Sequence, residues 1–520
     1  MTPPILVGIY QSEEEIHADE LAESLKLNPI PLSEDRMKMI TPPEIEDENI
    51  KKKFYELIRA YQDIFDWNND RIGTTNLLTY KMEMEEGPPI RSRPYRLSPA
   101  ESQVMKKEID KLVRLGVLRP STSEWSSPLL LIKKKNGSYR ICSDMRKVNQ
   151  RSRPDGYLPP RIDDLFNRLG TGKYRSTCDL TSAYYSVKIE EASIPVTAVV
   201  TDTGALYEYQ RMVQGSKRSA STMARLADLV FKKIIDMQAA VVYLDDVHVV
   251  SKTPELHLYH LQCTFQAIRN GGLVISPSKT FCFQKSLKFL GHIFTEEGIQ
   301  PDDSKLEAVK DIPILRTKTE ARSFLGMVSY YRKFIPRFTA IARPLHNLTK
   351  DGIQTWSPAA TKAFKKLKEC LVSPPILALP NFECDRPIII QTDACIDGLA
   401  CIACQEDEDG KERVICYLSR ATNKAEEKYA AVKLELCAVY WACCKLRTML
   451  YGRKFILETD NTGIIGLITS SDKLAGAVAR WVMYISEFDF TVRHKPDKKH
   501  KNVDYLSRLP ESSRSRITTT

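Results

Sequence analysis

The sequence predicts a multidomain α+β fold. At 520 residues the chain is long enough for about three or four domains. Its 42% hydrophobic and 27% charged residues are typical of a globular protein, and no window approaches ~20 uninterrupted apolar residues. From residue 386 onward the pattern becomes three strands, a long helix, a strand, two helices, a strand and a short helix. This order indicates a separate α/β unit that follows a longer mixed region.

Charge and cysteine content narrow the class of protein. Lys and Arg (76) exceed Asp and Glu (66), so a polyanionic partner is plausible. The 13 cysteines are scattered through apolar segments, which favours reduced, buried thiols over a disulfide framework. Cys401 and Cys404 form a CxxC without a second pair at zinc spacing, so we expect two core positions on a strand.

The first helices can be placed from their patterns. Residues 1–85 are expected to be an acidic leader with one amphipathic helix near residues 50–65. Ser98 then caps a helix that has Pro99 at its first position and ends at Gly116.

Two hairpins are expected in the middle of the chain. Residues 127–145 form two strands joined by Asn136-Gly137, a strong hairpin signal. Residues 239–251, AAVVYLDDVHVVS, form the second hairpin. The other elements expected before the α/β unit are helices at 160–170, 217–236, 304–312, 319–334 and 359–371, and strands at 173–180, 184–190 and 196–202.

The second hairpin places two acids between runs of β-branched residues. Because neighbouring strand side chains face opposite ways, Asp245 and Asp246 fit together only at a tight reversal. An unpaired buried carboxylate is costly, and no Lys or Arg lies within five residues, so Mg²⁺ is the better counter-charge. Asp163-Asp164 and Asp302-Asp303 instead stand at helix starts, where acids favour the helix dipole.

Several motifs resemble one family in order and register over residues 86–510. YLDD at 243–246 looks like the YxDD box of reverse transcriptases. The segments RSRPYRLSPAE, KKKNGSYRICSDMRKVNQ, YRSTCDLTSAYY, FLGHIFTEEGI, TDACIDGLA, YGRKFILETDN and VDYLSR continue the likeness. Together they resemble the polymerase and ribonuclease H segment of a Ty3/gypsy-type LTR retrotransposon.

The resemblance implies a right-hand polymerase of fingers, palm and thumb, followed by a connector and an α/β ribonuclease H fold. The expected domains are a leader at 1–85, fingers and palm at 86–275, a thumb-like helical region at 276–350, a connection at 351–385, ribonuclease H at 386–510 and a tail at 511–520.

The resemblance also implies a polymerase site. Asp179 would join Asp245 and Asp246 to hold two Mg²⁺ ions, with Mn²⁺ as a substitute, against the primer 3′-OH and a dNTP. Without it, Asp179 fits a strand-end acid equally well. The implied substrate contacts are Lys134 and Arg140 to the triphosphate, Tyr184 against a 2′-hydroxyl and Gln214 near the deoxyribose. The alternatives are a solvated KKKNGS turn and a core tyrosine.

In the second unit the resemblance implies four acids that hold two Mg²⁺ ions and activate water against RNA. They are Asp393, Glu435, Asp460 and Asp504. Glu435 also stands out by itself, at the edge of an apolar helical stripe, whereas Glu426 and Glu427 look like a solvated charge run. His494 fits an H-x-P pattern linked to product release, and fits a plain surface histidine nearly as well.

The segment 212–223, MVQGSKRSASTM, departs from the family pattern. Gypsy-type elements usually have Phe before the glycine and Pro a few residues later, whereas this chain has Gln214-Gly215, as in retroviral enzymes, and Ala220. Val503 replaces the alanine that usually precedes the last acid. A catalytically impaired or host-adopted nucleic-acid-binding derivative is therefore the alternative to an active enzyme, and the presence of all seven acids favours activity.

The resemblance sets the remaining expectations. The chain would copy retrotransposon RNA into DNA and cleave the RNA strand of RNA/DNA hybrids, and an RNA-dependent RNA polymerase is disfavoured by Tyr184. Its expected partners are an RNA template, a DNA primer-template, RNA/DNA hybrid, dNTPs and a tRNA primer, with a homodimer left open and no membrane. We expect a processed part of a polyprotein, in the cytoplasm and within virus-like particles.

Overall fold

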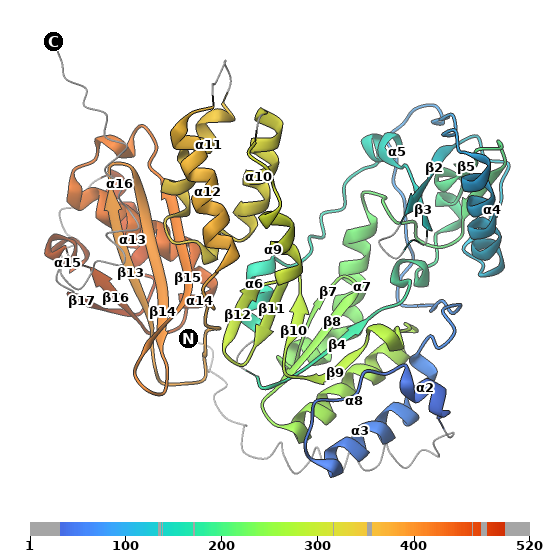
Figure 1. The fold of residues 1–520 in the computed structure, drawn as a ribbon, viewed down its shortest axis with the longest axis horizontal. Helices are drawn as coiled ribbons and strands as arrows, with labels where there is room; N and C mark the ends of the chain where they lie inside the picture. The colour runs from blue at the N-terminus through green and yellow to red at the C-terminus, as the bar shows by residue number, and fades with distance from the viewer. Residues whose placement is uncertain are drawn as a thin grey trace, which may run out of the picture. The chain divides into compact units, whose positions relative to one another are not determined.

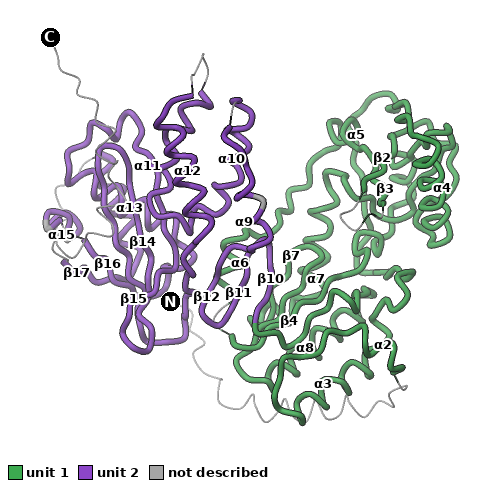
Figure 2. The backbone as a smooth tube through the Cα atoms, viewed as in Figure 1, with its two compact units in different colours: residues 1–285 green, residues 286–520 purple. Residues whose placement is uncertain are grey.

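The computed structural model describes residues 32–133, 137, 139–169, 172–315, 317–350, 356–459, 461–469 and 476–494. The chain divides into two compact units, residues 1–285 and 286–520 (Figure 2). Both contain helices and sheets, which confirms the predicted α+β class (Figure 1). No described helix combines the length and apolar character needed to cross a membrane. The expected site residues Lys134, Asp460 and Asp504 lie outside the described residues.

The first unit is built around an antiparallel four-stranded sheet in the order β7-β8-β4-β9. Helices α7 and α8 pack against its strands and against each other (Figure 1). The expected 239–251 hairpin is confirmed by the β7–β8 pair. The bounds are β4 Tyr174–Asp179, β7 Ala240–Tyr243, β8 Asp246–Ser251, β9 Phe281–Gln284, α7 Ser219–Asp236 and α8 Pro254–Asn270.

A second sheet of this unit has the order β1-β6-β5-β2-β3. The antiparallel pairing of β2 with β3 confirms the first predicted hairpin. Its strands are β1 Leu118–Pro120, β2 Ser127–Lys133, β3 Tyr139–Ser143, β5 Val199–Val200 and β6 Leu206–Tyr209. Two short helices, α5 (Arg146–Arg151) and α6 (Ile162–Arg168), follow the hairpin in sequence.

The predicted helix start at Ser98 is also confirmed. Helix α4 (Pro99–Arg114) begins with a capping box, in which the Ser98 hydroxyl accepts from the Glu101 amide and the Glu101 carboxylate accepts from the Ser98 amide. Gly116 follows the helix with φ +66°, a conformation that favours glycine.

The amphipathic helix expected near residues 50–65 is α3 (Glu48–Ala60). Asp47 caps its first turn, and its apolar face carries Phe54 and Leu57, both fully buried. This face packs against α8 and joins the core of the first unit. A short helix, α2 (Glu34–Lys38), precedes it.

The second unit begins with an antiparallel sheet, β10-β11-β12, and four helices. These elements are β10 Leu287–Phe289, β11 His292–Thr295, β12 Gly298–Pro301, α9 Asp303–Lys310, α10 Lys318–Tyr330, α11 Phe338–Leu348 and α12 Pro358–Val372. The helices expected at 304–312, 319–334 and 359–371 are thereby confirmed, although α10 ends four residues earlier than expected.

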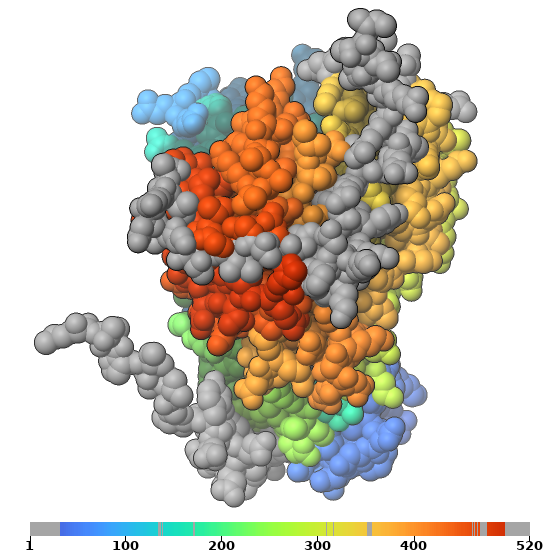
Figure 3. All heavy atoms as spheres, turned by 90° about the vertical axis from the view of Figure 1, so that its left-hand side faces the viewer, coloured from blue at the N-terminus to red at the C-terminus, as the bar shows by residue number. Residues whose placement is uncertain are grey.

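The α/β part of this unit is a mixed sheet in the order β15-β14-β13-β16-β17. Helix α13 packs on β13 and β14, which are buried along nearly their whole length. The surface over α16 and β17 is red in Figure 3. The bounds are β13 Ile388–Cys395, β14 Gly398–Glu406, β15 Glu412–Ala421, α13 Ala431–Lys445, α14 Arg447–Leu450, β16 Phe455–Thr459, α15 Thr462–Thr469, α16 Gly476–Ile485 and β17 Phe490–His494.

The cysteine prediction is confirmed in part. All 13 cysteines are free thiols, of which seven are buried, five are half-buried and Cys444 is exposed. Cys401 and Cys404 lie on β14 and are at most 1% exposed, so they are core residues.

Two local predictions are wrong. Residues 184–190 do not form a strand. Ala183–Ser186 is a 3₁₀ turn, and the backbone after it bonds to loops, with Lys188 accepting from the Tyr80 amide. Glu426 is not a solvated acid, because it is 8% exposed and accepts bonds of 2.6 and 2.8 Å from Arg420. This pair lies in a separate turn, so the long helix begins only at residue 431.

The buried histidine of β8 makes the first unit sensitive to acid. Burial lowers the pKa of His248 to about 3. The folded pKa lies below the unfolded pKa of about 6.5, so the folded state binds the proton less readily than the unfolded state. The contribution of His248 to stability is therefore fully present above pH 6.5 and is lost as the pH falls from 6.5 toward 3. The wild type should lose unfolding free energy when the pH falls from 6.5 to 5. We expect this loss to be about 2 kcal/mol smaller in His248→Gln.

Urea denaturation at both pH values measures this difference. The exposed His494→Gln is the control and should leave the slope unchanged. Equal slopes for wild type and His248→Gln would contradict the assignment.

Candidate active sites

The pairing of β4 with β8 brings the three acids predicted for the polymerase site together. Asp179, the last residue of β4, stands directly opposite Asp246, the first residue of β8. The Leu180 amide donates to the Asp245 carbonyl at 2.9 Å, which places the remaining acid beside them. The Ser276 amide donates to the Asp179 carbonyl at 3.0 Å and holds β4 from its other side.

The hairpin turn between β7 and β8 is as tight as the adjacent acids required. Tyr243 pairs with Asp246, so Leu244 and Asp245 alone form the turn. Leu244 has φ +56°, in the left-handed region that bulky residues seldom adopt. Strain of this kind persists only where the surrounding structure enforces it, and it tends to gather at functional sites.

Electrostatic repulsion among the acids is visible in their pKa values. Burial, followed by the charges of Asp245 and Asp179, raises the pKa of Asp246 to about 6. Burial and the charge of Asp179 also raise the pKa of Asp245 above its ordinary value. Close carboxylates that resist ionisation are stabilised by a nearby cation.

One cation comes from a distant part of the chain. Lys279 ends the 3₁₀ turn Pro277–Lys279. Its Nζ lies 3.0 and 3.3 Å from the two carboxylate oxygens of Asp179. The sequence interpretation, which found no basic residue within five positions, missed this contact because it spans 100 residues. The lysine side chain is 64% exposed, so it can leave the acids without opening the core.

The three acids fit a hard divalent cation by their chemistry. Mg²⁺ prefers carboxylate oxygens, needs only one or two from the protein and keeps several waters. Among the described residues, no three His, Cys, Asp or Glu side chains already form a group that could hold a metal ion. Asp179 holds the Lys279 ammonium at 3.0 Å, so a metal ion bound to these acids would compete with that contact.

The predicted substrate contacts are spread around the first unit. Tyr184 lies in the turn after β4, and its pKa is raised by burial and then by the charge of Asp245. Arg140 is exposed on β3, and Gln214 is exposed before α7. Within the described residues, no hydrogen bond or ion pair links Arg140 or Gln214 to the acids. Their roles stay predictions.

In the second unit, two of the four predicted acids meet at the end of β13. The Ala394 amide, directly after Asp393, donates to Glu435 Oε1 at 3.1 Å. Asp393 is 6% exposed and Glu435 is 8% exposed. Glu435 was expected at the edge of the apolar stripe of α13. Its side chain is instead buried and bonds to the backbone of β13. His494 is exposed at the end of β17, opposite Thr459.

A polar chain centred on the buried Glu458 was missed in the sequence interpretation. Glu458 on β16 is 1% exposed, accepts from Gln391 Nε2 at 2.8 Å, and accepts from Arg493 Nε at 2.6 Å. These contacts link β13, β16 and β17 at the level of Asp393. The sequence feature that could have predicted this chain is an acid, Glu458, inside the apolar strand FILET.

Family models match both units. Residues 132–294 match the model described as reverse transcriptase (RNA-dependent DNA polymerase). Residues 356–457 match the model of the RNase H-like domain found in reverse transcriptase. The first match includes Asp179, Asp245 and Asp246, and the second includes Asp393 and Glu435 and ends before Asp460.

Curated relatives give the same result. The chain is 33% identical over 423 residues to the retrovirus-related Pol polyprotein from transposon opus of Drosophila melanogaster, covering 78% of this chain and 42% of the relative. It is 30% identical over 481 residues to that from transposon gypsy of the same species, covering 89% and 46%. The chain thus spans less than half the length of these relatives.

Solved structures show the same fold. A foamy viral protease-reverse transcriptase in complex with dsDNA matches with a TM-score of 0.77 at 22% identity, covering 90% of this chain and 98% of that one. The same enzyme in complex with RNA/DNA hybrid matches with a TM-score of 0.74 at 22% identity, covering 95% and 66%.

The chain is a reverse transcriptase domain followed by an RNase H-like domain. More narrowly, it belongs with the Pol polyproteins of Ty3/gypsy-type retrotransposons, as the sequence motifs indicated.

The Lys279 contact gives a testable link between metal and stability. We expect Lys279→Met to unfold at a lower temperature than wild type without divalent metal, because three carboxylates lose their nearby cation. The exposure of the lysine limits the effect to about 1 kcal/mol. Added Mg²⁺ should close the gap, and thermal unfolding with and without Mg²⁺ measures it.

Lys285→Met is the matched control, since Lys285 belongs to the same unit and lies outside the acid cluster. A gap between Lys279→Met and wild type that Mg²⁺ leaves unchanged would contradict the proposed competition.

Proposed function

We propose that the first unit is an RNA- and DNA-templated DNA polymerase that copies retrotransposon RNA, and that the second cleaves the RNA strand of RNA/DNA hybrids. The single observation that carries the proposal is the pairing of Asp179 with Asp246 across β4 and β8, beside Asp245. Three neighbouring carboxylates, of which Asp245 and Asp246 have a raised pKa, suit a phosphoryl-transfer site when they lie on strands fixed from both sides.

In the polymerase reaction the chain supplies position and charge. Asp179, Asp245 and Asp246 would hold two Mg²⁺ ions, or Mn²⁺ in their place. When bound, the ions lower the pKa of the primer 3′-OH and neutralise the triphosphate and leaving pyrophosphate. The β4–β8 pairing keeps the acids at fixed places while these charges change. Lys279, displaced from Asp179, remains nearby as a mobile positive charge.

Four residues would bind and select the nucleotide. Lys134 and Arg140 at the β2–β3 hairpin would contact the triphosphate, since a guanidinium offers a planar fork to phosphate oxygens. The Tyr184 ring, in the turn that follows β4, would meet the sugar and exclude a 2′-hydroxyl. Gln214, exposed before α7, would hydrogen-bond near the deoxyribose.

The ribonuclease H reaction would use the acids of the second unit. Asp393 and Glu435 meet at the end of β13 and, with Asp460 and Asp504, would hold two Mg²⁺ ions that activate water against the RNA phosphodiester. Contacts to 2′-hydroxyls would select RNA. His494, exposed on β17, would help release the product.

The partners follow from the reaction. They are an RNA template, a DNA primer-template, RNA/DNA hybrid, dNTPs and a tRNA primer, acting in cytoplasmic virus-like particles, with a homodimer as the assembly to test. The solved foamy viral enzyme was captured with dsDNA and with RNA/DNA hybrid, which supports such partners for this chain. The net charge of +10 suits polyanionic ligands.

Two variants should separate the activities. Asp245→Asn should lower dTTP incorporation on poly(rA)/oligo(dT) with Mg²⁺ by at least ~100-fold and leave hybrid cleavage intact, because it removes a charge from one site only. Glu435→Gln should do the reverse. Incorporation of labelled dTTP and loss of labelled RNA from a hybrid measure the two activities.

The exposed acids Asp163→Asn and Glu427→Gln are the matched controls, one in each unit, and should keep both activities. Equal incorporation by wild type and Asp245→Asn would remove the polymerase proposal. It would leave the impaired or host-adopted nucleic-acid-binding derivative as the better reading.

A further inference from the structure

The turn before α7, residues 213–217, is held by side chains from elsewhere in the first unit. Asn149 Nδ2 donates to the Gly215 carbonyl at 2.8 Å, and Asn149 Oδ1 accepts from the Lys217 amide at 2.7 Å. Lys217 Nζ donates to the Ser152 carbonyl at 3.1 Å. The turn is also bonded to the first residue of the helix that follows, since the Ser219 hydroxyl donates to the Val213 carbonyl at 2.6 Å and the Ser219 amide donates to the Ser216 carbonyl at 3.2 Å.

Helix α7 itself begins without an ordinary cap. Arg218 occupies the N-cap position, and its side chain makes no capping hydrogen bond. Ala220 stands where the resembling family usually has proline, so the helix start also lacks a residue that fixes φ. Besides the two Ser219 bonds, side chains from other segments of the first unit contact the junction between the turn and the helix.

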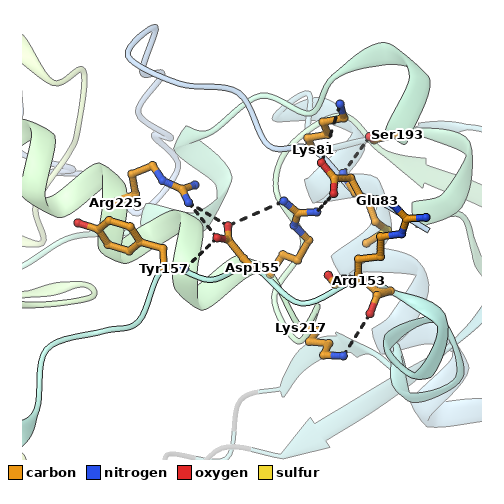
Figure 4. Close-up of polar contacts among 11 residues, drawn as sticks. Lys81, Glu83, Arg153, Asp155, Tyr157, Ser193, Lys217 and Arg225 are labelled. Carbon is orange, nitrogen blue, oxygen red and sulfur yellow. Dashed lines mark hydrogen bonds and ion pairs between the residues drawn. The ribbon is translucent and has the colours of Figure 1, made fainter. Parts of the chain in front are cut away.

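Four residues, Glu83, Arg218, Asp155 and Arg225, form an ion chain at this junction, and Figure 4 labels Glu83, Asp155 and Arg225. Arg218 Nη1 lies 3.0 Å from Glu83 Oε2, and Arg218 Nη2 lies 3.9 Å from Asp155 Oδ2. Arg225, two turns further along α7, donates to both Asp155 oxygens at 2.9 and 3.1 Å. The guanidinium of Arg225 also lies over the Tyr157 ring, 4.9 Å from its centroid.

The centre of this chain is shielded from water. The side chains of Arg218 and Asp155 are 13% and 8% exposed. Burial raises the pKa of Asp155, but the Tyr157 amide and the Arg225 guanidinium outweigh it and hold the pKa below its ordinary value. Removing one partner of a buried ion pair is costly because the other charge stays buried and uncompensated.

The outer acid of the chain is fixed as well. The Arg153 amide donates to the Glu83 carbonyl at 2.9 Å, so the segments that carry Glu83 and Asp155 are bonded to each other. From the same segment as Glu83, the Tyr80 hydroxyl bonds to Ser216 inside the turn. Three distant parts of the chain therefore meet around Arg218.

We propose that Arg218 and Asp155 are positioning residues that fix the 213–217 turn, and with it the exposed Gln214, in the shape that the incoming dNTP meets. The ion chain replaces the conformational restriction that proline would give at residue 220. The role assigned to Gln214 rests on the proposed polymerase function, whereas the fixing of the turn does not.

The test compares Arg218→Met, Asp155→Asn and the control Lys232→Met. Lys232 forms an exposed pair with Asp236 on the same helix, so its removal leaves the chain of ions intact. Amide hydrogen exchange is read at Lys217 and Ser219, whose N–H groups are bonded to Asn149 Oδ1 and the Ser216 carbonyl. Steady-state kinetics give KM for dTTP and kcat.

We expect exchange at both amides to accelerate about tenfold in Arg218→Met and Asp155→Asn, and not in Lys232→Met. KM for dTTP should rise about tenfold with kcat changed less than about threefold, and hybrid cleavage by the second unit should stay the same. Arg218→Lys, which keeps the charge, should recover part of both effects. Asp155→Asn keeps the side-chain shape and serves if Arg218→Met fails to fold.

Unchanged exchange in folded Arg218→Met or Asp155→Asn would overturn the fixing of the turn. Faster exchange with an unaltered KM would overturn its role toward the nucleotide. If wild type incorporates no dTTP, the polymerase proposal fails, and the exchange data still decide whether the ion chain fixes the turn.

Discussion

The antiparallel pairing of β4 with β8 is the interaction on which the rest of the first unit depends. It places the strand-end acid of β4 opposite the first acid of β8, and the two-residue turn of β7–β8 supplies the third. The cost of this arrangement is visible in the strained Leu244 and in the raised pKa of Asp246. Packing of α7 and α8 on the sheet keeps these carboxylates together against their repulsion.

The second unit uses a different device for the same problem. Its acid Glu435 comes from a buried helix and reaches the amide after Asp393, so a backbone donor satisfies one carboxylate oxygen. The neighbouring Glu458 is neutralised by Arg493 and bonded by Gln391, which ties three strands together. Unlike charges and backbone donors thus hold this site, whereas in the candidate site of the first unit the described residues place like charges beside the exposed Lys279.

Sequence reasoning predicted what local pattern determines. The Asn136-Gly137 hairpin, the capped helix at Ser98 and the tight turn at the paired acids follow from neighbours in the chain, and the motif order indicated the family. It missed α8, α11 and the strands β9 to β12, and α11 carries Pro344 inside it, a residue that argues against a helix. Contacts between distant segments, such as Lys279 with Asp179, were also missed, because the residues next to each partner in the sequence do not show which distant residue it contacts in the folded chain.

Anomalous diffraction from crystals of the chain soaked in Mn²⁺ is the most direct measurement of the central claim. The account predicts a metal peak in the first unit within about 2–2.5 Å of oxygens of Asp179 and of at least one acid of the β7–β8 hairpin, with the Lys279 ammonium moved away. Full Mn²⁺ occupancy elsewhere in the crystal with no peak between these strands, and Lys279 still on Asp179, would contradict it.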